Sequence, residues 1–129
     1  AFLLAAAKIP AELPGTLLNT GNIKGGTPAT NVVPDFAQAE LDLRITKMSD
    51  EAPFFSRLRA LAEEIGSAHE VKFDLNIWLN RPPKENHPAE AALFPHFQRA
   101  AADVGLTPFN WVHGGGASDG NFLGAAGLP

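Results

Sequence analysis

The sequence contains no cysteine, and this absence excludes two kinds of site. Without thiols the chain forms neither a disulfide framework nor a zinc site held by thiolates, although its compartment stays open. Basic residues are also few, because ten Lys and Arg stand against fourteen Asp and Glu, for a formal net charge of -4. Binding to a phosphate backbone relies on clustered cations, and these ten do not cluster. We therefore expect no nucleic-acid partner.

Long apolar runs are missing as well. The most apolar stretch, residues 1–13, is interrupted by Lys8 and Pro10, so no run approaches the ~20 residues that a membrane-spanning helix requires. The same stretch lacks the basic leader and the cleavage pattern of a signal peptide. We expect no membrane partner and a cytoplasmic location, with a secreted or periplasmic location left open.

The length and the composition fit an ordinary globular domain. The 129 residues, of which 45% are hydrophobic, are enough to build a core. The chain opens on Ala1 in the middle of a predicted helix, and it closes where a new segment should begin. We therefore expect an excised piece of a longer protein.

Periodicity over the first 80 residues predicts five elements in the order helix, strand, strand, helix, strand. In the second strand the side chains alternate between two faces, which is typical of an antiparallel strand with one face in solvent. In the first strand we expect Leu17 and Ile23 to point inward. Ser49 or Asp50 should cap the second helix, and Gly66 should stop it. The five ranges are helix 2–9, strand 16–26, strand 36–46, helix 51–65 and strand 70–79.

One further strand in front would complete the order β-α-β-β-α-β of a ferredoxin-like sandwich. The predicted fold class is therefore α+β, with a ferredoxin-like antiparallel sheet, two helices on one face and the first strand missing. After a pair of prolines the pattern changes to helix 88–104, strand 107–112, a glycine loop and a short helix, which is typical of parallel α/β structure. We place a domain boundary here, between residues 1–81 and residues 82–129.

Asn31 and Arg44 are candidates for binding a carboxylate. The guanidinium can donate two parallel hydrogen bonds to the carboxylate, and the Asn can donate from its side-chain NH2. Asn31 lies in the loop between two predicted strands, and Arg44 lies on the polar face of the second one. Spacing alone leaves an alternative open, in which Arg44 pairs with Asp42 or Glu40 on a solvated face and Asn31 serves the turn.

Arg81 and the stretch GGGASDG, residues 114–120, are further candidates. The glycines place backbone N–H groups before a predicted helix, which suits an anion or a carboxylate. The stretch matches neither the lysine-bearing phosphate loop nor the dinucleotide fingerprint. In the alternative interpretation Arg81 contacts Trp78 or Glu85, and Ser118–Asp119 caps the helix.

The histidines do not form a recognisable metal site. They lie in different elements and in none of the short spacings that hold zinc, so we expect no complete metal site from this chain. We expect solvated or hydrogen-bonded rings instead. The four are His69, His87, His96 and His113.

The stretch GNIKGGTPATNVVPDFAQAELDLR, residues 21–44, resembles the lid, or dimerisation, domain of the zinc-dependent superfamily of carboxypeptidases, aminoacylases and succinyl-diaminopimelate desuccinylases. In that family a loop with a Gly-Gly pair, an Asn and a Pro precedes a strand that ends in Asp-x-Arg. The stretches NRPPKENHP and GGGASDGNFLGAAGLP resemble the return into the catalytic domain in the glutamate carboxypeptidase-like branch. The similarity covers nearly all of residues 1–129 in the right order.

The resemblance implies a hydrolase of amide or peptide bonds, either a carboxypeptidase or an N-acyl amino acid amidohydrolase, that acts on carboxylate-bearing substrates. It implies two zinc ions in the full-length protein, a metal-bridging water as nucleophile and a Glu as general base. The metal ligands and that Glu are expected outside residues 1–129. The resemblance also implies a homodimer through residues 2–26. The residues that it assigns to substrate binding are Asn31, Arg44, Arg81, Gly114, Gly115, Gly116 and Ser118.

A second interpretation is a stand-alone ferredoxin-like module that binds a small ligand or regulates another domain. The two interpretations differ in what they require after residue 82. A regulatory module has no use for a helix, strand, glycine loop and helix of parallel α/β type, so this segment favours the hydrolase.

Overall fold

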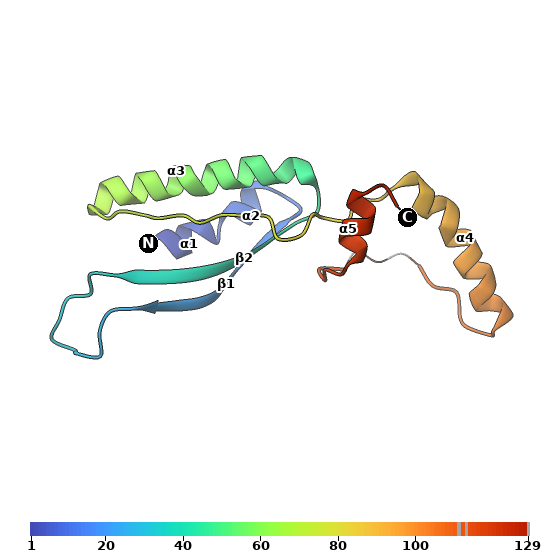
Figure 1. Cartoon of the computed structure of the whole chain (residues 1–129), viewed down its shortest axis with the longest axis horizontal. Helices are drawn as coiled ribbons and strands as arrows, with labels where there is room; N and C mark the ends of the chain where they lie inside the picture. The colour runs from blue at the N-terminus through green and yellow to red at the C-terminus, as the bar shows by residue number, and fades with distance from the viewer. Residues whose placement is uncertain (111, 113, 129) are drawn as a thin grey trace. The chain divides into compact units, whose positions relative to one another are not determined.

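The computed structural model describes residues 1–110, 112 and 114–128, and it divides the chain into two compact units (Figure 1). The chain passes from one unit to the other around residues 45–49 and again at residues 77 and 78. The first unit comprises residues 1–45 and 49–77, and the second comprises residues 46–48 and 78–129. The predicted boundary between functional domains at residues 81 and 82 stays a prediction.

The first unit contains a helical N-terminal segment, a β-hairpin and a long helix. The predicted helix 2–9 forms as two short helices, and Pro10 lies in the first turn of the second, where its missing N–H needs no intrahelical partner. Asp50 precedes the long helix as expected, but its side chain forms no capping hydrogen bond. The elements up to residue 69 are α1 Phe2–Ala6, α2 Ile9–Glu12, β1 Thr16–Gly25, β2 Ala37–Ile45, the 3-10 turn η1 Met48–Asp50 and α3 Glu51–His69.

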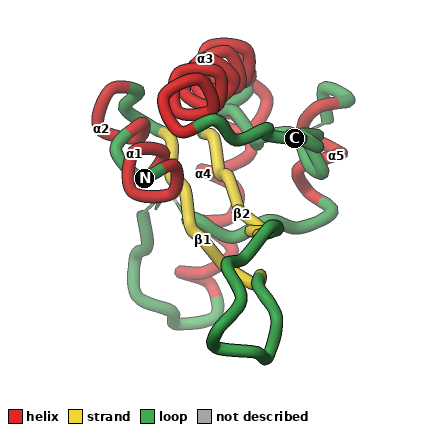
Figure 2. The backbone as a smooth tube through the Cα atoms, turned by 90° about the vertical axis from the view of Figure 1, so that its left-hand side faces the viewer, coloured by secondary structure: helices red, strands yellow, loops and turns green. Residues whose placement is uncertain are grey.

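Strands β1 and β2 form the predicted antiparallel hairpin (Figure 2). The pairing register shifts between Thr20 and Asn22, so Gly21 is an extra residue in β1. A β-bulge of this kind reverses the face to which the following side chains belong. Glycine suits the position because it adopts the irregular backbone of a bulge without a steric penalty.

The bulge explains why the prediction for Leu17 and Ile23 is wrong. Six residues apart, the two would share a face on a regular strand. Instead Leu17 pairs with Arg44 on the exposed face, while Ile23 pairs with Ala39 on the other face. Neither is buried, since Leu17 is 54% exposed and Ile23 is 63% exposed. Leu18 takes the inward position and packs against the core.

The core of the first unit lies between one face of the hairpin and its helices. Phe54 of α3 and Ile9 of α2 are the largest fully buried side chains. Leu18 of β1 and Leu43 of β2 pack against the same cluster, so the helices cover a single face of the sheet (Figures 1 and 2). This arrangement confirms the predicted α+β class. The buried cluster is Ala6, Ile9, Phe54, Leu58 and Leu61.

Helix α3 does not stop at Gly66, as the sequence predicted, but continues to His69. The left-handed residue that ends the helix is Glu70, with φ of 54°. Gly66 has a different purpose, because a Cβ there would lie 2.8 Å from the carbonyl oxygen of Val71. The Val71 N–H donates to the Gly66 carbonyl at 3.0 Å. The glycine therefore lets the chain turn back closely against the helix.

The predicted strand 70–79 is wrong as a strand, because the described sheet contains only β1 and β2. The predicted alternation is present in part, with Leu75 and Ile77 half-buried and Asp74 and Asn76 exposed. A side-chain pattern can form without a ladder, but a strand requires a neighbouring backbone to pair with. In the ferredoxin-like order that neighbour is the strand before the first helix, and here α1 begins at Phe2.

The second unit contains two helices and long connecting segments. Helix α4, Pro88–Asp103, matches the predicted helix 88–104 and runs through Pro95, and Gly105 follows it with φ of 75°. Helix α5, Gly120–Ala125, is the predicted short helix, and Gly127 follows it with φ of 80°. The predicted strand 107–112 is not found at residues 107–110 or 112, and its Trp111 lies outside the described residues.

Candidate functional site

The first candidate, Asn31, lies in the loop that joins β1 to β2, and its side chain is exposed. Apolar residues of the same loop are exposed too, with Val33 at 87% and Phe36 at 63%. The position of such a loop is fixed by the two strands that it joins and not by packing of its own side chains. Asn31 is therefore accessible to a ligand or to another chain.

Arg44 lies near the far end of β2 on the exposed face of the hairpin. Its Nε donates to Asp42 Oδ2 at 3.0 Å, and its Nη2 lies 3.0 Å from the same oxygen. Both side chains are about half exposed, so the pair contributes little to stability, on the order of 1 kcal/mol or less. The alternative interpretation of Arg44 is thus present in the structure. An exposed pair of this kind can still exchange Asp42 for a substrate carboxylate.

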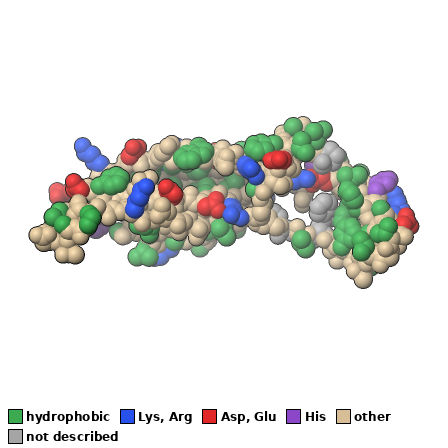
Figure 3. Space-filling model, turned by 60° about the horizontal axis from the view of Figure 1, so that its bottom comes forward, with side chains coloured by type: hydrophobic (Ala, Val, Ile, Leu, Met, Phe, Trp, Pro, Cys, Tyr) green, Lys and Arg blue, Asp and Glu red, His purple; other side chains and the backbone are tan. Residues whose placement is uncertain are grey.

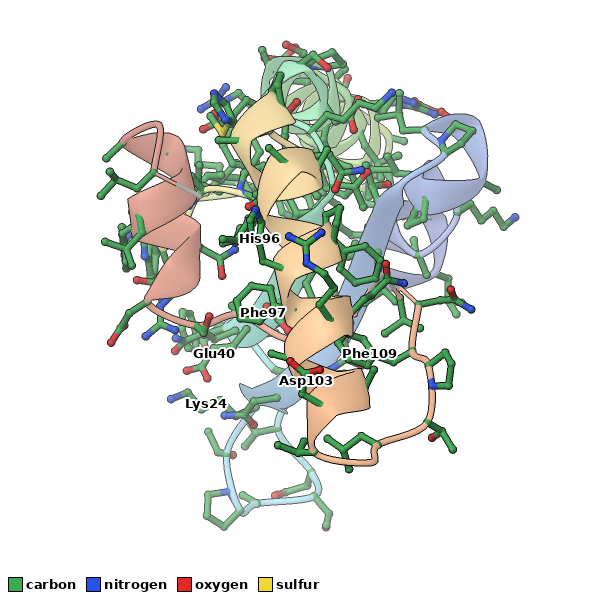
Figure 4. All side chains as sticks on the ribbon, turned by 90° about the vertical axis from the view of Figure 1, so that its right-hand side faces the viewer. Lys24, Glu40, His96, Phe97, Asp103 and Phe109 are labelled. Carbon is green, nitrogen blue, oxygen red and sulfur yellow. The ribbon has the colours of Figure 1, made fainter. Side chains whose placement is uncertain are left out.

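The exposed face of the hairpin carries mixed charge. Lys24 and Glu40 project from the same side of the two strands (Figure 4), and Asp42 and Arg44 follow along β2. On the face of the molecule in Figure 3, Lys and Arg side chains are scattered among Asp and Glu. The exclusion of a nucleic-acid partner stays a prediction.

Asn31 and Arg44 are not brought together within one chain. The hairpin register pairs Gly25 with Ala37 at the loop end and Leu17 with Arg44 near the other end. Seven residues of strand separate positions 37 and 44, which is about 23 Å at 3.3 Å per residue. One small carboxylate therefore cannot contact both side chains of the same hairpin.

In the second unit two predicted candidates, Arg81 and Ser118, are each next to contacts made by α5. The guanidinium carbon of Arg81 lies 5.8 Å from the centroid of the Phe122 ring in α5. Next to it, the Asn121 side chain donates to the Pro82 carbonyl and accepts from the Ser118 N–H, both at 2.9 Å. The segment that carries Arg81 is thereby held against the helix that follows the glycine stretch.

The glycine stretch itself is open. A Cβ at Gly114 or at Gly116 would meet nothing within 4 Å, and neither residue has a positive φ. Neither packing nor backbone conformation thus demands glycine here, whereas close approach of a ligand to the backbone would. Ser118 Oγ accepts from the Gly120 N–H at 3.2 Å, so Ser118 caps the first turn of α5. Asp119 forms no side-chain cap.

Sequence reasoning missed the polar cluster at the start of α4. His87 is the N-cap residue, its Nδ1 accepts from the Ala89 N–H at 3.2 Å, and Glu90 reaches back to the His87 N–H at 3.4 Å. Lys84 Nζ lies 2.7 Å from Glu90 Oε1. The signal was a Glu three residues after the cap with Pro at the first position, but histidine rarely stands as the cap.

Glu90 is buried, with 8% of its surface exposed. The Lys84 ammonium in contact with the carboxylate lowers the pKa of Glu90, burial acts in the opposite direction, and the His87 N–H favours the charged form as well. The carboxylate is therefore ionised at neutral pH. It ties the segment before α4 to the helix.

Two open clefts adjoin this cluster in the second unit. Their volumes are about 490 Å³ and about 460 Å³. Glu85 and Asn86 line both, and Glu85 accepts from the Met48 N–H at 2.8 Å. None of the predicted substrate-binding residues lines either cleft. The first is lined by Thr46, Lys47, Lys84, Glu85 and Asn86, and the second by Met48, Pro82, Pro83, Glu85, Asn86, His87, Gly124 and Ala125.

The described residues do not fit a zinc centre. Across residues 1–110, 112 and 114–128, no three His, Asp or Glu side chains gather where they could hold a metal ion. His87 is used as a helix cap, and His96 contacts Arg99 at 2.9 Å. His113 lies outside the described residues. No catalytic step through zinc can therefore be assigned to the described side chains.

No helix in the described part is long and apolar enough to cross a bilayer.

Comparison with known families assigns the first unit. Residues 2–70 match the family described as the peptidase dimerisation domain, which is more than half of the chain. This chain belongs to the peptidase dimerisation domain family. The resemblance that the Gly-Gly loop and the Asp-x-Arg strand suggested is thereby confirmed at the level of the family.

Relatives of this family member extend the similarity beyond residue 70. The chain is 29% identical over 114 residues to a succinyl-diaminopimelate desuccinylase of Psychrobacter arcticus, covering 88% of this chain and 28% of the relative. It is 33% identical over 111 residues to a desuccinylase of Bordetella avium, covering 85% of this chain and 28% of the relative. The chain thus spans less than a third of the length of these relatives.

A solved structure shows the same fold. The crystal structure of aminopeptidase PepT from Bacillus cereus matches with a TM-score of 0.61 at 25% identity, over 98% of this chain and 35% of that one. These relatives are desuccinylases and an aminopeptidase, so the narrower placement in a glutamate carboxypeptidase-like branch stays a prediction.

Proposed function

We propose that this chain is the dimerisation domain and part of the catalytic domain of a hydrolase that cleaves amide or peptide bonds in carboxylate-bearing substrates. One observation carries the proposal: the similarity to desuccinylases covers 88% of the chain, whereas the dimerisation family alone covers residues 2–70. A stand-alone ferredoxin-like module would need only the first part. A similarity over 114 residues extends into the second unit, and the structural similarity to the aminopeptidase covers 98% of the chain.

The proposed substrate class follows from the chemistry of the relatives and of the candidate residues. Succinyl-diaminopimelate is an amide that carries free carboxylates, and Arg44 and Arg81 are exposed guanidinium groups suited to bind them. In the proposal Gly114, Gly115, Gly116 and Ser118 line the substrate pocket, and the glycines leave the backbone accessible. The peptidase relatives favour the same class of bond.

The proposed assembly is a homodimer through residues 2–26. Within the described residues β1 pairs only with β2, so the other edge of β1 offers unpaired backbone groups. Two such edges can pair across a two-fold axis. Because Asn31 and Arg44 lie at opposite ends of the hairpin, each would reach a different place in that dimer.

Zinc is proposed for the whole enzyme at the level of the family, with two ions. The described side chains gather no ligand set, so the ligands would come from elsewhere in the longer polypeptide. When bound, the ions would activate a water molecule for attack on the amide carbonyl.

The proposed compartment is the cytoplasm, which fractionation of the source cells would test.

The proposal is tested on the full-length gene product. We expect hydrolysis of succinylated or other N-acyl amino acids and of dipeptides, lost on chelation and restored by zinc. The matched control uses the same acyl groups on amines that carry no carboxylate, which should be poor substrates. A metal-replete gene product that cleaves none of these amides, while the separate first unit binds a small ligand, would establish the regulatory module instead.

A further inference from the structure

Asn121 joins two separate parts of the second unit. Its Oδ1 accepts a hydrogen bond from the Ser118 N–H at 2.9 Å, and its Nδ2 donates to the Pro82 carbonyl oxygen at 2.9 Å. Pro82 is 39 residues away in the sequence. A single side chain therefore connects the end of the glycine stretch to the segment that precedes α4.

Only one orientation of this amide satisfies both contacts. A backbone N–H can only donate and a carbonyl can only accept, so a flipped amide would place donor against donor and oxygen against oxygen. Asn121 is half-buried, which makes an unpaired partner costly. An aspartate at this position would keep the Ser118 contact and lose the Pro82 contact. An alanine would lose both.

The neighbouring residue makes a parallel contact. The Phe122 ring lies 5.8 Å from the guanidinium carbon of Arg81, the residue immediately before Pro82. Two consecutive residues of α5 thus hold two consecutive residues of the incoming segment. Because the φ angles of Pro82 and Pro83 are fixed by their rings, movement of this short segment is already restricted. These contacts hold Arg81 and Pro82 against the first turn of α5, to which the Asn121 side chain also ties the Ser118 N–H.

We propose that Asn121 is a positioning residue, which holds Arg81 at a fixed place beside the Gly114–Ser118 stretch so that one substrate carboxylate meets both. The inference rests on the proposed function, in which Arg81 binds that carboxylate. Asn121 does not touch the substrate. Loss of the Pro82 contact releases the arginine segment and weakens substrate binding while the bond-breaking step is unchanged.

The test compares Asn121→Asp with Asn121→Ala in the full-length gene product, with Asn76→Asp as the matched control on an exposed site. Both Asn121 variants should raise KM about tenfold with kcat within about twofold, because both remove the half-buried hydrogen bond to Pro82. The control should leave both constants unchanged. In an Arg81→Ala background Asn121→Asp should have no further effect, because the residue acts through Arg81.

Several results would overturn the proposal. A wild-type KM in Asn121→Asp together with a raised KM in Asn121→Ala would reduce Asn121 to a cap for Ser118. If Asn121→Asp still raises KM to the same extent in the Arg81→Ala background, Asn121 does not act through Arg81. If the aspartate variant does not fold, Asn121→Ser removes the Pro82 contact without adding charge and takes its place in the comparison with the Arg81→Ala background.

A readout without catalysis separates this inference from the proposed function. In the 129-residue chain, the backbone amide resonances of Arg81 and Phe122 should shift in Asn121→Asp and stay in place in Asn76→Asp. The Ser118 amide should stay protected from exchange in Asn121→Asp and lose protection in Asn121→Ala. If these shifts are present but the full-length gene product does not hydrolyse amides, the proposed hydrolase function is contradicted and the positioning role is not. If the shifts are absent, the positioning role is overturned.

Discussion

At the scale of single residues, the Lys84–Glu90 pair shows how charge is placed in the second unit. Glu90 is buried, contacts Lys84 at 2.7 Å and reaches back to the cap of α4. Lys84 also lies beside α5, since a Cβ at Gly124 would come within 3.2 Å of its side chain. One ion pair therefore links the start of α4 with α5. Removing either partner leaves the other charge without compensation.

The lowered pKa of Glu90 predicts a loss of stability in acid. The group has a lower pKa in the folded state, so its contribution is present above its unfolded pKa of about 4.3 and is lost as the pH falls through the folded value. Urea midpoints measured from pH 7 to pH 3 should fall less steeply in Glu90→Gln than in the wild-type chain. The exposed Glu63→Gln variant is the control and should follow the wild type. Parallel curves for all three would contradict this.

Arg44 and Arg81 predict a loss of carboxylate binding when they are truncated. Each presents an exposed guanidinium, so replacement by Ala should cost about 2 kcal/mol, or roughly 30-fold in kcat/KM, with zinc content unchanged. Replacement by Lys should restore only part of kcat/KM, because an ammonium group cannot form the bidentate contact with a carboxylate. Arg59→Ala on the exposed face of α3 is the control. Unchanged kcat/KM in both variants would make them ordinary surface arginines.

The residues that sequence reasoning could find are those with a distinctive chemical type. Arg44 and Arg81 stand out because a guanidinium can bind a carboxylate with two parallel hydrogen bonds. Asn121 does not stand out, because its role comes from a contact with Pro82, 39 residues away. Spacing alone did not decide whether Asn31 and Arg44 bind one carboxylate together, and the hairpin register separates them.

At the scale of elements, the helices and the β1–β2 hairpin were predictable, but the bulge in β1 and the absence of pairing at residues 70–79 were not. The hydrophobic spacing of α3 and of α4 and the glycine that follows α4 are local signals, so the sequence predicts both helices. The bulge at Gly21 and the missing ladder at residues 71–79 depend on partners that the local pattern does not reveal. Alternation therefore predicted faces on β2 correctly and a strand at 70–79 wrongly.

Gly66 gives a prediction at this scale. Alanine in a helix interior usually stabilises it by about 1 kcal/mol relative to glycine, but the new Cβ would lie 2.8 Å from the Val71 carbonyl. Displacing that backbone should cost about 2 kcal/mol, so Gly66→Ala should destabilise the first unit by about 1 kcal/mol net. Chemical denaturation measures this. Ser67→Ala on the exposed side of α3 is the control and should be neutral or stabilising. A gain of stability in Gly66→Ala would show that residues 70–73 yield freely.

At the scale of the whole molecule, the predicted assembly depends on the edge of β1 that β2 does not pair with. In the first unit β1 and β2 have one ladder between them, and their helices cover only one face. The opposite face exposes Leu17 beside the charged residues of β2. An unpaired edge next to an exposed leucine favours association with a second edge of the same kind. Membership of the dimerisation family points in the same direction.

We predict a homodimer through residues 2–26, and we predict that a charge introduced on β1 weakens this dimer. Leu17→Lys places a cation on the edge strand without entering the core, because Leu17 is 54% exposed. Sedimentation velocity over a range of concentrations should show a dimer for the wild-type chain and a shift towards monomer for Leu17→Lys. Val33→Lys is the matched control, since Val33 is 87% exposed in the hairpin loop and outside residues 2–26. Loss of the dimer in the control instead would move the interface to the loop, and a concentration-independent monomer in all three would remove it.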